Sequence, residues 1–219
     1  MRTFIAVELP PDIQQYLARL ITLYQQAGIR DIRWTPVKNI HLTLRFLGDS
    51  SPVQLNAIKQ ALAGTIAAYP VFDIELGGNG VFPNLKRPRI LWAGANIPDS
   101  LRQMQQQIET ICREAGFKAE ERAFSPHLTL GRFSEYASSD NVARLTKVWK
   151  ENANSPAPSP SAHVTSITLF KSDLRPGGAV CSVLEHFPLK TVWDNKHFYA
   201  KIMNNWRDRF MPVEITANR

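Results

Sequence analysis

The chain has 219 residues, of which 44% are hydrophobic and 21% are charged, a balance that is ordinary for a globular protein and excludes a disordered chain. No apolar run approaches the roughly 18 residues of a membrane helix, and the apolar patch Phe4–Val7 is too short for a secretory signal, so we expect a cytoplasmic protein without a membrane anchor. The 26 basic and 19 acidic residues give a net charge of +7, which favours polyanionic partners, although a solvated basic surface without a partner would carry the same charge.

The first half of the chain predicts strands that alternate with helices. The prolines after the first strand end it, and apolar residues then recur at helical spacing until Gly28. Ser51 has the position of an N-cap residue, and a proline follows it in the first helical turn. The expected elements are strand Arg2–Leu9, helix Pro11–Ala27, strands Asp31–Thr35 and Ile40–Leu47, and a helix from Ser51 to Ile66.

The second half repeats this alternation and predicts an α+β protein. Several neighbouring strands have no crossover helix between them, which is typical of antiparallel sheets. Prolines make Ser155–Ser161 a flexible loop. The remaining expected elements are strands Val71–Leu76 and Arg89–Ala95, helix Pro98–Ala115, strand material at Arg122–Phe124 and His127–Phe133, a helix near Asp140–Lys150, and strands His163–Ser172 and Ala179–Leu189.

One tetrapeptide occurs twice, as His41-Leu42-Thr43-Leu44 and as His127-Leu128-Thr129-Leu130. Each copy lies on an expected strand and runs on to an arginine and a phenylalanine. Because side chains alternate along a strand, the histidine and threonine of each copy share one face, and the two leucines enter the core from the other. If a pseudo-twofold axis relates two duplicated lobes, the two His/Thr pairs face each other across a groove.

Two facing histidines are suited to phosphoryl chemistry. Opening a cyclic phosphodiester needs a base for the attacking water and an acid for the departing sugar oxygen, and imidazole fills either role near neutral pH. Each threonine hydroxyl can donate to a nonbridging phosphate oxygen, so the scheme needs no metal. The competing interpretation is that both histidines are packed or surface residues.

Other catalytic arrangements lack their signatures. There is no HExxH, no HxH and no carboxylate at ligand spacing, which argues against a metal site. A Ser-His-Asp triad would need a GxSxG elbow, which is absent. Cys112 and Cys181 form no CxxC pair, so we expect two reduced thiols.

Two arginines are candidates for binding phosphate. Arg45 has the strand parity of His41 and could face the groove, whereas Arg132 has the wrong parity relative to His127 unless Gly131 permits a bulge. A guanidinium there would hold phosphate through two hydrogen bonds. A solvated arginine at the end of a strand is the alternative.

The sequence resembles the 2H phosphoesterase superfamily and, within it, the bacterial RNA 2′,3′-cyclic phosphodiesterases once called 2′-5′ RNA ligases. The resemblance spans about residues 1–190, and neither HxTx motif is specific without its flanking segments. The matching segments are RTFIAVELP, HLTLRFLGD, GVFPNLKRPRILWAG, SPHLTLGRF and LFKSDLRPGGAV…VLEHFPL.

The resemblance implies a bilobal duplicated fold, with two antiparallel sheets facing a central groove and helices on the outside. It implies that His41 donates a proton to the leaving 3′-oxygen and that His127 is the base that activates water, with a 2′-phosphomonoester as product. The family's second motif carries an arginine five residues after its histidine, which maps to Arg132 and favours it over Arg45 as the phosphate-binding residue. Phe46 holds the equivalent position in the first copy, where it could stack on a base. Expected partners are RNA or nucleotides with 2′,3′-cyclic phosphate ends, with no cofactor, and we favour a monomer.

Two features depart from the family. Cys181 stands in the last strand where relatives commonly carry an aromatic residue, which could alter the edge of the groove. Residues 191–219 extend beyond the phosphoesterase domain of residues 1–190, and apolar residues recur there every four positions, which predicts an amphipathic helix that docks on the body, mediates self-association or is accidental. Those residues are Phe198, Ile202, Trp206 and Phe210.

Three alternatives to a hydrolase stay open. The first is a nucleotide- or RNA-binding module that uses the same groove without turnover. The second is ligation of a cyclic phosphate end to a 5′-hydroxyl, which reverses the same chemistry. The third is a basic interaction protein, which leaves the repeated motif unexplained. His163, His186 and His197 have no partner motif and are interpreted as structural or surface residues.

Overall fold

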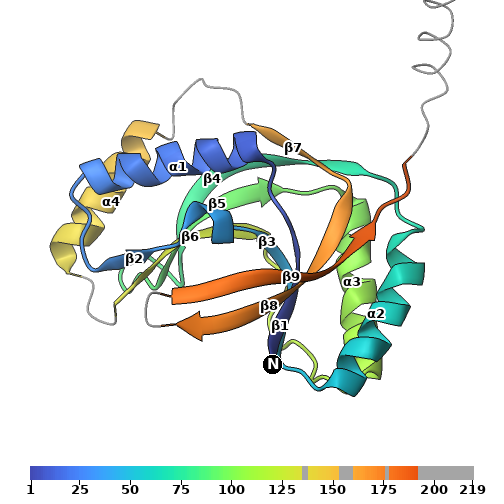
Figure 1. Cartoon of the computed structure of the whole chain (residues 1–219). Helices are drawn as coiled ribbons and strands as arrows, with labels where there is room; N and C mark the ends of the chain where they lie inside the picture. The colour runs from blue at the N-terminus through green and yellow to red at the C-terminus, as the bar shows by residue number, and fades with distance from the viewer. Residues whose placement is uncertain (135–137, 153–159, 176–177, 192–219) are drawn as a thin grey trace, which may run out of the picture.

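Two antiparallel sheets form the centre of the protein (Figure 1), whose computed structural model describes residues 1–134, 138–152, 160–175 and 178–191. We call them sheet A and sheet B. Sheet A consists, in spatial order, of β3 (Leu42–Asp49), β1 (Arg2–Val7), β8 (Ser166–Arg175) and β9 (Gly178–Pro188). Sheet B consists of β2 (Ile32–Trp34), β6 (His127–Phe133), β5 (Ile90–Asn96), β4 (Phe72–Phe82) and β7 (Ser161–Val164). The predicted α+β fold with two antiparallel sheets is therefore confirmed.

In the described part of the chain, four α-helices cover the outside in two pairs (Figure 1). One pair is α1 (Pro11–Gln26) and α4 (Ser139–Asn152), where the Arg144 guanidinium donates to the carbonyl of Ala27 just after α1. The other pair is α2 (Pro52–Ile66) and α3 (Asp99–Glu114), which contact each other and reach β9 and β3 respectively. A short 3-10 turn, η1 (Val37–Asn39), precedes β3.

The predicted helix starts have clear local causes. Ser51 caps α2 as expected: its hydroxyl accepts from the backbone N–H of Gln54, whose side chain accepts from the N–H of Ser51 in return. Both α1 and α2 have proline in the first turn, where the missing N–H costs nothing. Each of the two helices buries one apolar stripe.

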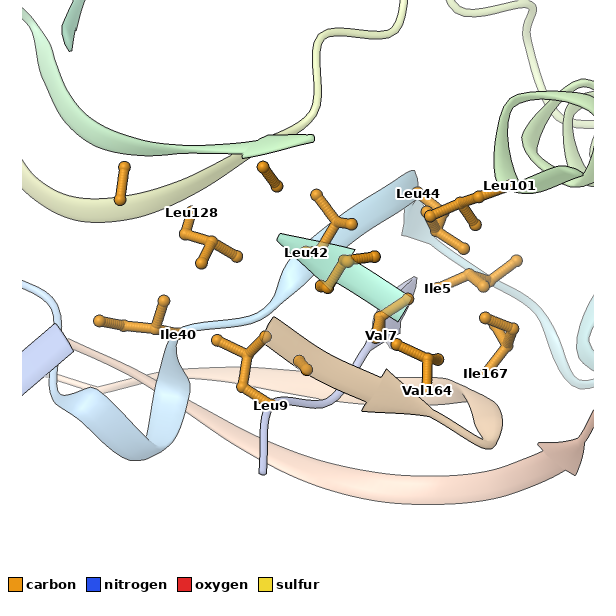
Figure 2. Packing of buried hydrophobic residues seen from close by; sticks show 14 of the residues in the cluster. Ile5, Val7, Leu9, Ile40, Leu42, Leu44, Leu101, Leu128, Val164 and Ile167 are labelled. Carbon is orange, nitrogen blue, oxygen red and sulfur yellow. The ribbon is translucent and has the colours of Figure 1, made fainter. Parts of the chain in front are cut away.

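The leucines of the two repeated tetrapeptides belong to one core. Leu42, Leu44, Leu128 and Leu130 are all buried in a single cluster that also contains Ile5, and Figure 2 shows Leu42, Leu44 and Leu128 among their neighbours. Burial of a leucine side chain contributes roughly 1.5–3 kcal/mol. These leucines therefore fix the orientation of β3 and β6, and the opposite face of each strand carries the histidine and threonine.

The chain contains a duplicated arrangement, but its sheets mix the two halves. The order β1-α1-β3-α2 matches β5-α3-β6-α4, and in each half the first strand pairs antiparallel with the strand that carries the motif. Two exchanges join the halves. β2 from the first half pairs with β6 in sheet B, and β8 from the second half pairs with β1 in sheet A.

Three strand predictions differ from the structure. Arg122–Phe124 is not a strand and belongs to the loop before β6. The strand expected at Val71–Leu76 continues as β4 through a glycine-rich stretch to Phe82. The single strand expected at His163–Ser172 is two strands, since the chain leaves sheet B after Val164 and enters sheet A at Ser166.

Some predictions fall wholly or partly outside the described residues. Of the expected loop Ser155–Ser161, only the last two residues are described, and Ser161 begins β7. The C-terminal helix expected around Phe198–Phe210 lies outside them. Within the described ranges, no helix combines the length and apolarity needed to cross a bilayer.

Candidate active site

A groove of about 270 Å³ opens between strands of both sheets. From sheet A it is lined by residues of β1 and β3, by Ser172 of β8 and by the start of β9, and from sheet B by residues of β2 and β6. Of the residues predicted from the sequence, it brings together His41, Thr43, Phe46, Thr129 and Arg132.

A bulge in β3 decides which side chains reach the groove. Neighbouring residues of β1 pair with Thr43 and Arg45, so Leu44 is an extra residue that reverses the alternation of side chains. Phe46 consequently lies on the groove face with Thr43, and 54% of its surface is exposed. Arg45 turns toward the core and is only 7% exposed, with its Nε 2.5 Å from the carboxylate of Glu109 on α3. The expectation that Arg45 could face the groove is wrong.

A matching bulge in β6 brings Arg132 into the groove. Neighbouring residues of β5 pair with Thr129 and Gly131, so the extra residue is Leu130, at the same place in the motif as the bulge in β3. The bulge lies one residue before the glycine at which it was expected. With the alternation reversed, Thr129 and Arg132 line the same groove despite their sequence parity.

His41 lies in a stack of aromatic rings at the residue before β3. Its ring centroid is 4.5 Å from that of Phe4 and 5.7 Å from that of Phe170, and the planes are tilted by 24° and 23°. The rings shield part of the imidazole from water, and burial disfavours its charged form. The pKa of His41 is lowered from 6.5 to about 4, so the ring is neutral at pH 7 in the free protein.

His127 begins β6 and is held by the loop before it. Its Nδ1 is 2.7 Å from the backbone carbonyl of Ser125. Because a carbonyl only accepts hydrogen bonds, Nδ1 carries the proton and the neutral ring presents Nε2 as an acceptor. The Phe82 ring meets the imidazole edge-to-face at 5.1 Å. His127 is not among the residues lining the 270 Å³ groove, although it shares a strand face with Thr129, which lines it.

The groove is electropositive. Arg2, Arg33 and Arg132 line it, and the described lining residues include no carboxylate. The pKa of Arg132 is lowered, first by burial and second by the nearby charge of Arg33. Cations held together without a carboxylate form a site for anions.

Sequence reasoning missed several lining residues. Phe4 was placed on the first strand, but its stacking on His41 depends on the pairing of β1 with β3. Arg33 lies in the middle of the short strand β2. The only signal in the sequence was the alternation of Ile32, Arg33 and Trp34, which places the arginine on the opposite face of the strand from its two neighbours. Cys181, noted for departing from the family, does line the groove.

The other histidines lie in separate settings. His163 is exposed, with its Nδ1 2.8 Å from the carboxylate of Asp73, and His186 is close to Glu8 and Thr168. His197 lies outside the described residues. Across the described part of the chain, no three His, Cys, Asp or Glu side chains gather in a way that could hold a metal ion.

The sequence matches the family of LigT like phosphoesterases over residues 7–92 and 94–180. It is 29% identical over 189 residues to an RNA 2′,3′-cyclic phosphodiesterase of Methanothermobacter thermautotrophicus, covering 86% of this chain and 99% of that protein. An RNA 2′,3′-cyclic phosphodiesterase of Aeropyrum pernix is 32% identical over 169 residues, which are 77% of this chain and 92% of that protein.

Solved structures share the fold. TT0787 of Thermus thermophilus matches with a TM-score of 0.67 at 28% identity, over 87% of this chain and 99% of that one. LigT of Escherichia coli in complex with 3′-AMP matches with a TM-score of 0.65 at 26% identity, over 86% of this chain and 97% of that one.

Proposed function

This chain belongs to the LigT-like phosphoesterase family, and we propose that it is an RNA 2′,3′-cyclic phosphodiesterase that opens cyclic phosphate ends to 2′-phosphomonoesters. The observation that carries the proposal is the electropositive groove in which His41, Thr43, Thr129 and Arg132 converge from both sheets, with His127 at the start of the same strand as Thr129. Its relatives named RNA 2′,3′-cyclic phosphodiesterases support the substrate class.

In the proposed reaction His127 is the general base and His41 the general acid. The Nε2 of His127 takes a proton from water, whose oxygen attacks phosphorus, and the bond from phosphorus to the 3′-oxygen breaks. His41 gives a proton to that oxygen, which leaves as a hydroxyl, and the phosphate stays on the 2′-oxygen. The hydrogen bond from His127 Nδ1 to the carbonyl of Ser125 supports the base role, because it directs the lone pair of the neutral ring to Nε2.

The acid role of His41 requires a proton that the free protein does not hold at pH 7. Burial among phenylalanines keeps the pKa of His41 at about 4 when the groove contains no anion. A bound phosphate supplies a negative charge beside the ring, and a nearby opposite charge favours the protonated form. Substrate binding therefore raises the pKa of His41 and shifts the ring toward its protonated form when a leaving oxygen is present to receive the proton.

The remaining groove residues bind the substrate. The hydroxyls of Thr43 and Thr129 donate to nonbridging phosphate oxygens, where charge builds up in the transition state. Arg132 neutralises the phosphate through its guanidinium. Phe46 presents an exposed ring on which a base of the RNA end can stack. The complex of the E. coli relative with 3′-AMP supports a nucleotide in this groove.

If the 5′-hydroxyl of a second RNA attacked phosphorus in place of water, the same groups would join the two RNA ends by a 2′-5′ linkage. Removal of a proton from the hydroxyl and donation of one to the 3′-oxygen need no further residue. We place this ligation beside hydrolysis as a secondary activity that requires a high concentration of 5′-hydroxyl ends, since water competes for the same position.

The proposal is tested by incubating the protein with a 2′,3′-cyclic nucleotide in excess EDTA and resolving the 2′- and 3′-monophosphates by chromatography. We expect only the 2′-phosphate, because His41 protonates the 3′-oxygen. Both His41→Ala and His127→Ala should lower turnover by about 10²–10⁴-fold, the range for a lost acid or base. His163→Ala, which removes an exposed histidine outside the groove, is the matched control and should retain full activity.

Three outcomes would contradict parts of the proposal. Loss of turnover in EDTA would refute the metal-independent mechanism. Full turnover in both groove variants would refute the assignment of the histidines. Tight binding of the nucleotide without any product would indicate a binding module rather than an enzyme.

A further inference from the structure

Arg33 stands directly beside Arg132 in the groove wall. β2 is an edge strand of sheet B and pairs with β6 so that Arg33 lies opposite Arg132. Directly opposite residues on antiparallel strands project to the same face, with their Cβ atoms about 4.5–5.5 Å apart. Both arginines line the 270 Å³ groove. Their guanidinium groups are therefore available to the same bound molecule.

The two arginines carry more positive charge than one cyclic phosphate needs. Neither forms an ion pair with an acidic residue in the described part of the chain, and like charges directly opposite each other on a sheet are destabilising. The lowered pKa of Arg132 has the charge of Arg33 as one of its causes. A cyclic phosphodiester carries a single negative charge, which Arg132 alone can balance. Binding of a second anion would reduce the repulsion between the two guanidinium groups.

Chemistry identifies the second anion. In an RNA end that carries a 2′,3′-cyclic phosphate, the next phosphate along the chain is attached to the 5′-oxygen of the terminal nucleoside. Arg33 lies one strand farther from Thr129 than Arg132 does, and neighbouring strands are about 4.8 Å apart. It is thus displaced outward from the reacting phosphate, in the direction in which a chain leaving the groove would continue past the edge of the sheet.

We infer, on the premise of the proposed function, that Arg33 binds the internucleotide phosphate on the 5′ side of the terminal nucleoside, so that this protein selects oligoribonucleotide ends over cyclic mononucleotides. A guanidinium presents donors in the planar fork that matches a phosphate diester. Arg33 is a specificity-determining residue in this arrangement, and the reaction itself takes place at the histidines and threonines.

The experiment compares kcat/KM for three substrates: adenosine 2′,3′-cyclic phosphate, the same nucleotide with a 5′-monophosphate, and the dinucleotide ApA with a terminal 2′,3′-cyclic phosphate. In the wild-type protein the dinucleotide should exceed the unphosphorylated mononucleotide by about tenfold, as expected for one charge-assisted contact. Arg33→Ala should remove that ratio, and Arg33→Lys should restore part of it. Arg19→Ala removes a charge that is also exposed, from α1 outside the groove, and should leave the ratio unchanged.

Salt dependence gives a second measurement. Salt screens each contact between a guanidinium and a phosphate. In the wild type, the affinity for the dinucleotide should therefore fall more steeply with salt concentration than the affinity for the unphosphorylated mononucleotide. In Arg33→Ala the two slopes should coincide.

Several results would overturn the inference. Equal losses for all three substrates in Arg33→Ala would place the arginine at the reacting phosphate. A wild-type gain seen with the 5′-monophosphate but not with the dinucleotide would indicate a nucleotide rather than an RNA end. A dinucleotide ratio that persists in Arg33→Ala would exclude Arg33 from the contact. Absence of turnover with every substrate would refute the proposed function together with the inference, whereas turnover at equal rates would refute the inference alone.

Discussion

The imidazole of His41 is the group in the groove whose environment most strongly opposes its charged form. The rings of Phe4 and Phe170 both stack with the imidazole. They also stack on each other, with their centroids 5.0 Å apart. Apolar rings replace the water that would solvate an imidazolium. In the proposed mechanism His41 must hold a proton during the reaction, although the free protein keeps the ring neutral at pH 7. We therefore propose that an anion in the groove controls its protonation.

We predict an acid-sensitive stability that depends on His41. Its pKa of about 4 in the fold lies below the ordinary 6.5, so the unfolded chain binds the proton first as the pH falls. The contribution of the neutral ring is fully present above pH 6.5, falls between 6.5 and 4, and then levels off. It amounts to at most about 3 kcal/mol. The measurement is the free energy of urea unfolding from pH 4 to 7, compared with His41→Phe, which fills the stack but does not titrate.

The same group provides a test of the acid role by NMR. The His41 ring should titrate near pH 4 in the free protein, and its pKa should rise when a 2′-nucleotide product occupies the groove. The stability profile of His41→Phe should lack the loss between pH 6.5 and 4. Identical acid profiles in both proteins, or a His41 pKa unaffected by the nucleotide, would contradict this account.

At the residue scale, the sequence identified the motif residues but could not settle which neighbours join them. The parity rule placed Arg45 toward the groove and Arg132 away from it, and both results are reversed by bulges at Leu44 and Leu130. A bulge depends on which residues of the partner strand form hydrogen bonds. The sequence of one strand alone does not determine that register. Only the resemblance to a family favoured Arg132. Arg33 was missed because its partner strand lies far along the sequence.

Among the elements, β2 is held against β6 by a contact that requires glycine. A Cβ atom added to Gly131 would lie 2.7 Å from the Cδ1 atom of Ile32 and 3.2 Å from the carbonyl oxygen of Arg33. Both distances are too short for ordinary packing. Gly131 therefore permits β2 to approach β6 closely, which sets the separation between Arg33 and Arg132.

Gly131→Ala should destabilise the protein by about 1–3 kcal/mol, the usual range for overpacking. The reason is that Ile32 or the whole of β2 must move outward. In an Ile32→Ala background the same substitution should cost clearly less, because the clashing Cγ1 and Cδ1 atoms are gone. Urea unfolding of the four proteins in this double-mutant cycle measures the difference. An equal cost in both backgrounds would show that Ile32 is not the obstacle.

Strand limits were harder to predict than strand existence. The glycine-rich end of β4 gave no strand pattern, yet Gly80 allows the Trp92 indole of β5 to lie against its backbone, where a Cβ would be only 2.2 Å from the ring. The run from His163 onward reads as one alternating strand, but Thr165 divides it between two sheets. Alternation reports that a segment is half-buried in a sheet and does not identify which sheet it joins.

On the scale of the whole molecule, the duplication that the repeated motif indicated is present, but the two halves do not form separate sheets. β2 contributes to sheet B, and β8 and β9 contribute to sheet A, so each sheet contains strands from both halves of the chain. Leucines of both motifs belong to the same core cluster. The position of the two threonines on either side of one groove thus depends on the complete set of strands, and we expect the halves to unfold together.

Backbone contacts near the end of the described residues indicate a C-terminal boundary for this unit. After β9, the buried Leu189 donates its N–H to the carbonyl of Thr165, and Lys190 donates to Tyr69 and accepts from Val71. These bonds join the segment after β9 to the start of β4 and to the crossing between the sheets. We propose that the phosphoesterase domain ends at about residue 190, and the family match, which ends at residue 180, supports this boundary.

A chain that stops after Thr191 should therefore keep the stability and kcat/KM of the full protein, within about 0.5 kcal/mol, the usual range for changes that touch no buried contact. A chain that stops after Pro188 loses the buried Leu189 and the hydrogen bonds of Lys190, so it should be destabilised by at least about 3 kcal/mol. Urea unfolding and turnover of a 2′,3′-cyclic nucleotide measure both effects. If stopping after Thr191 were as damaging as stopping after Pro188, residues 192–219 would be part of the folding unit, and the boundary at about residue 190 would be wrong. If stopping after Thr191 lowered turnover but not stability, residues 192–219 would contribute to the active-site groove.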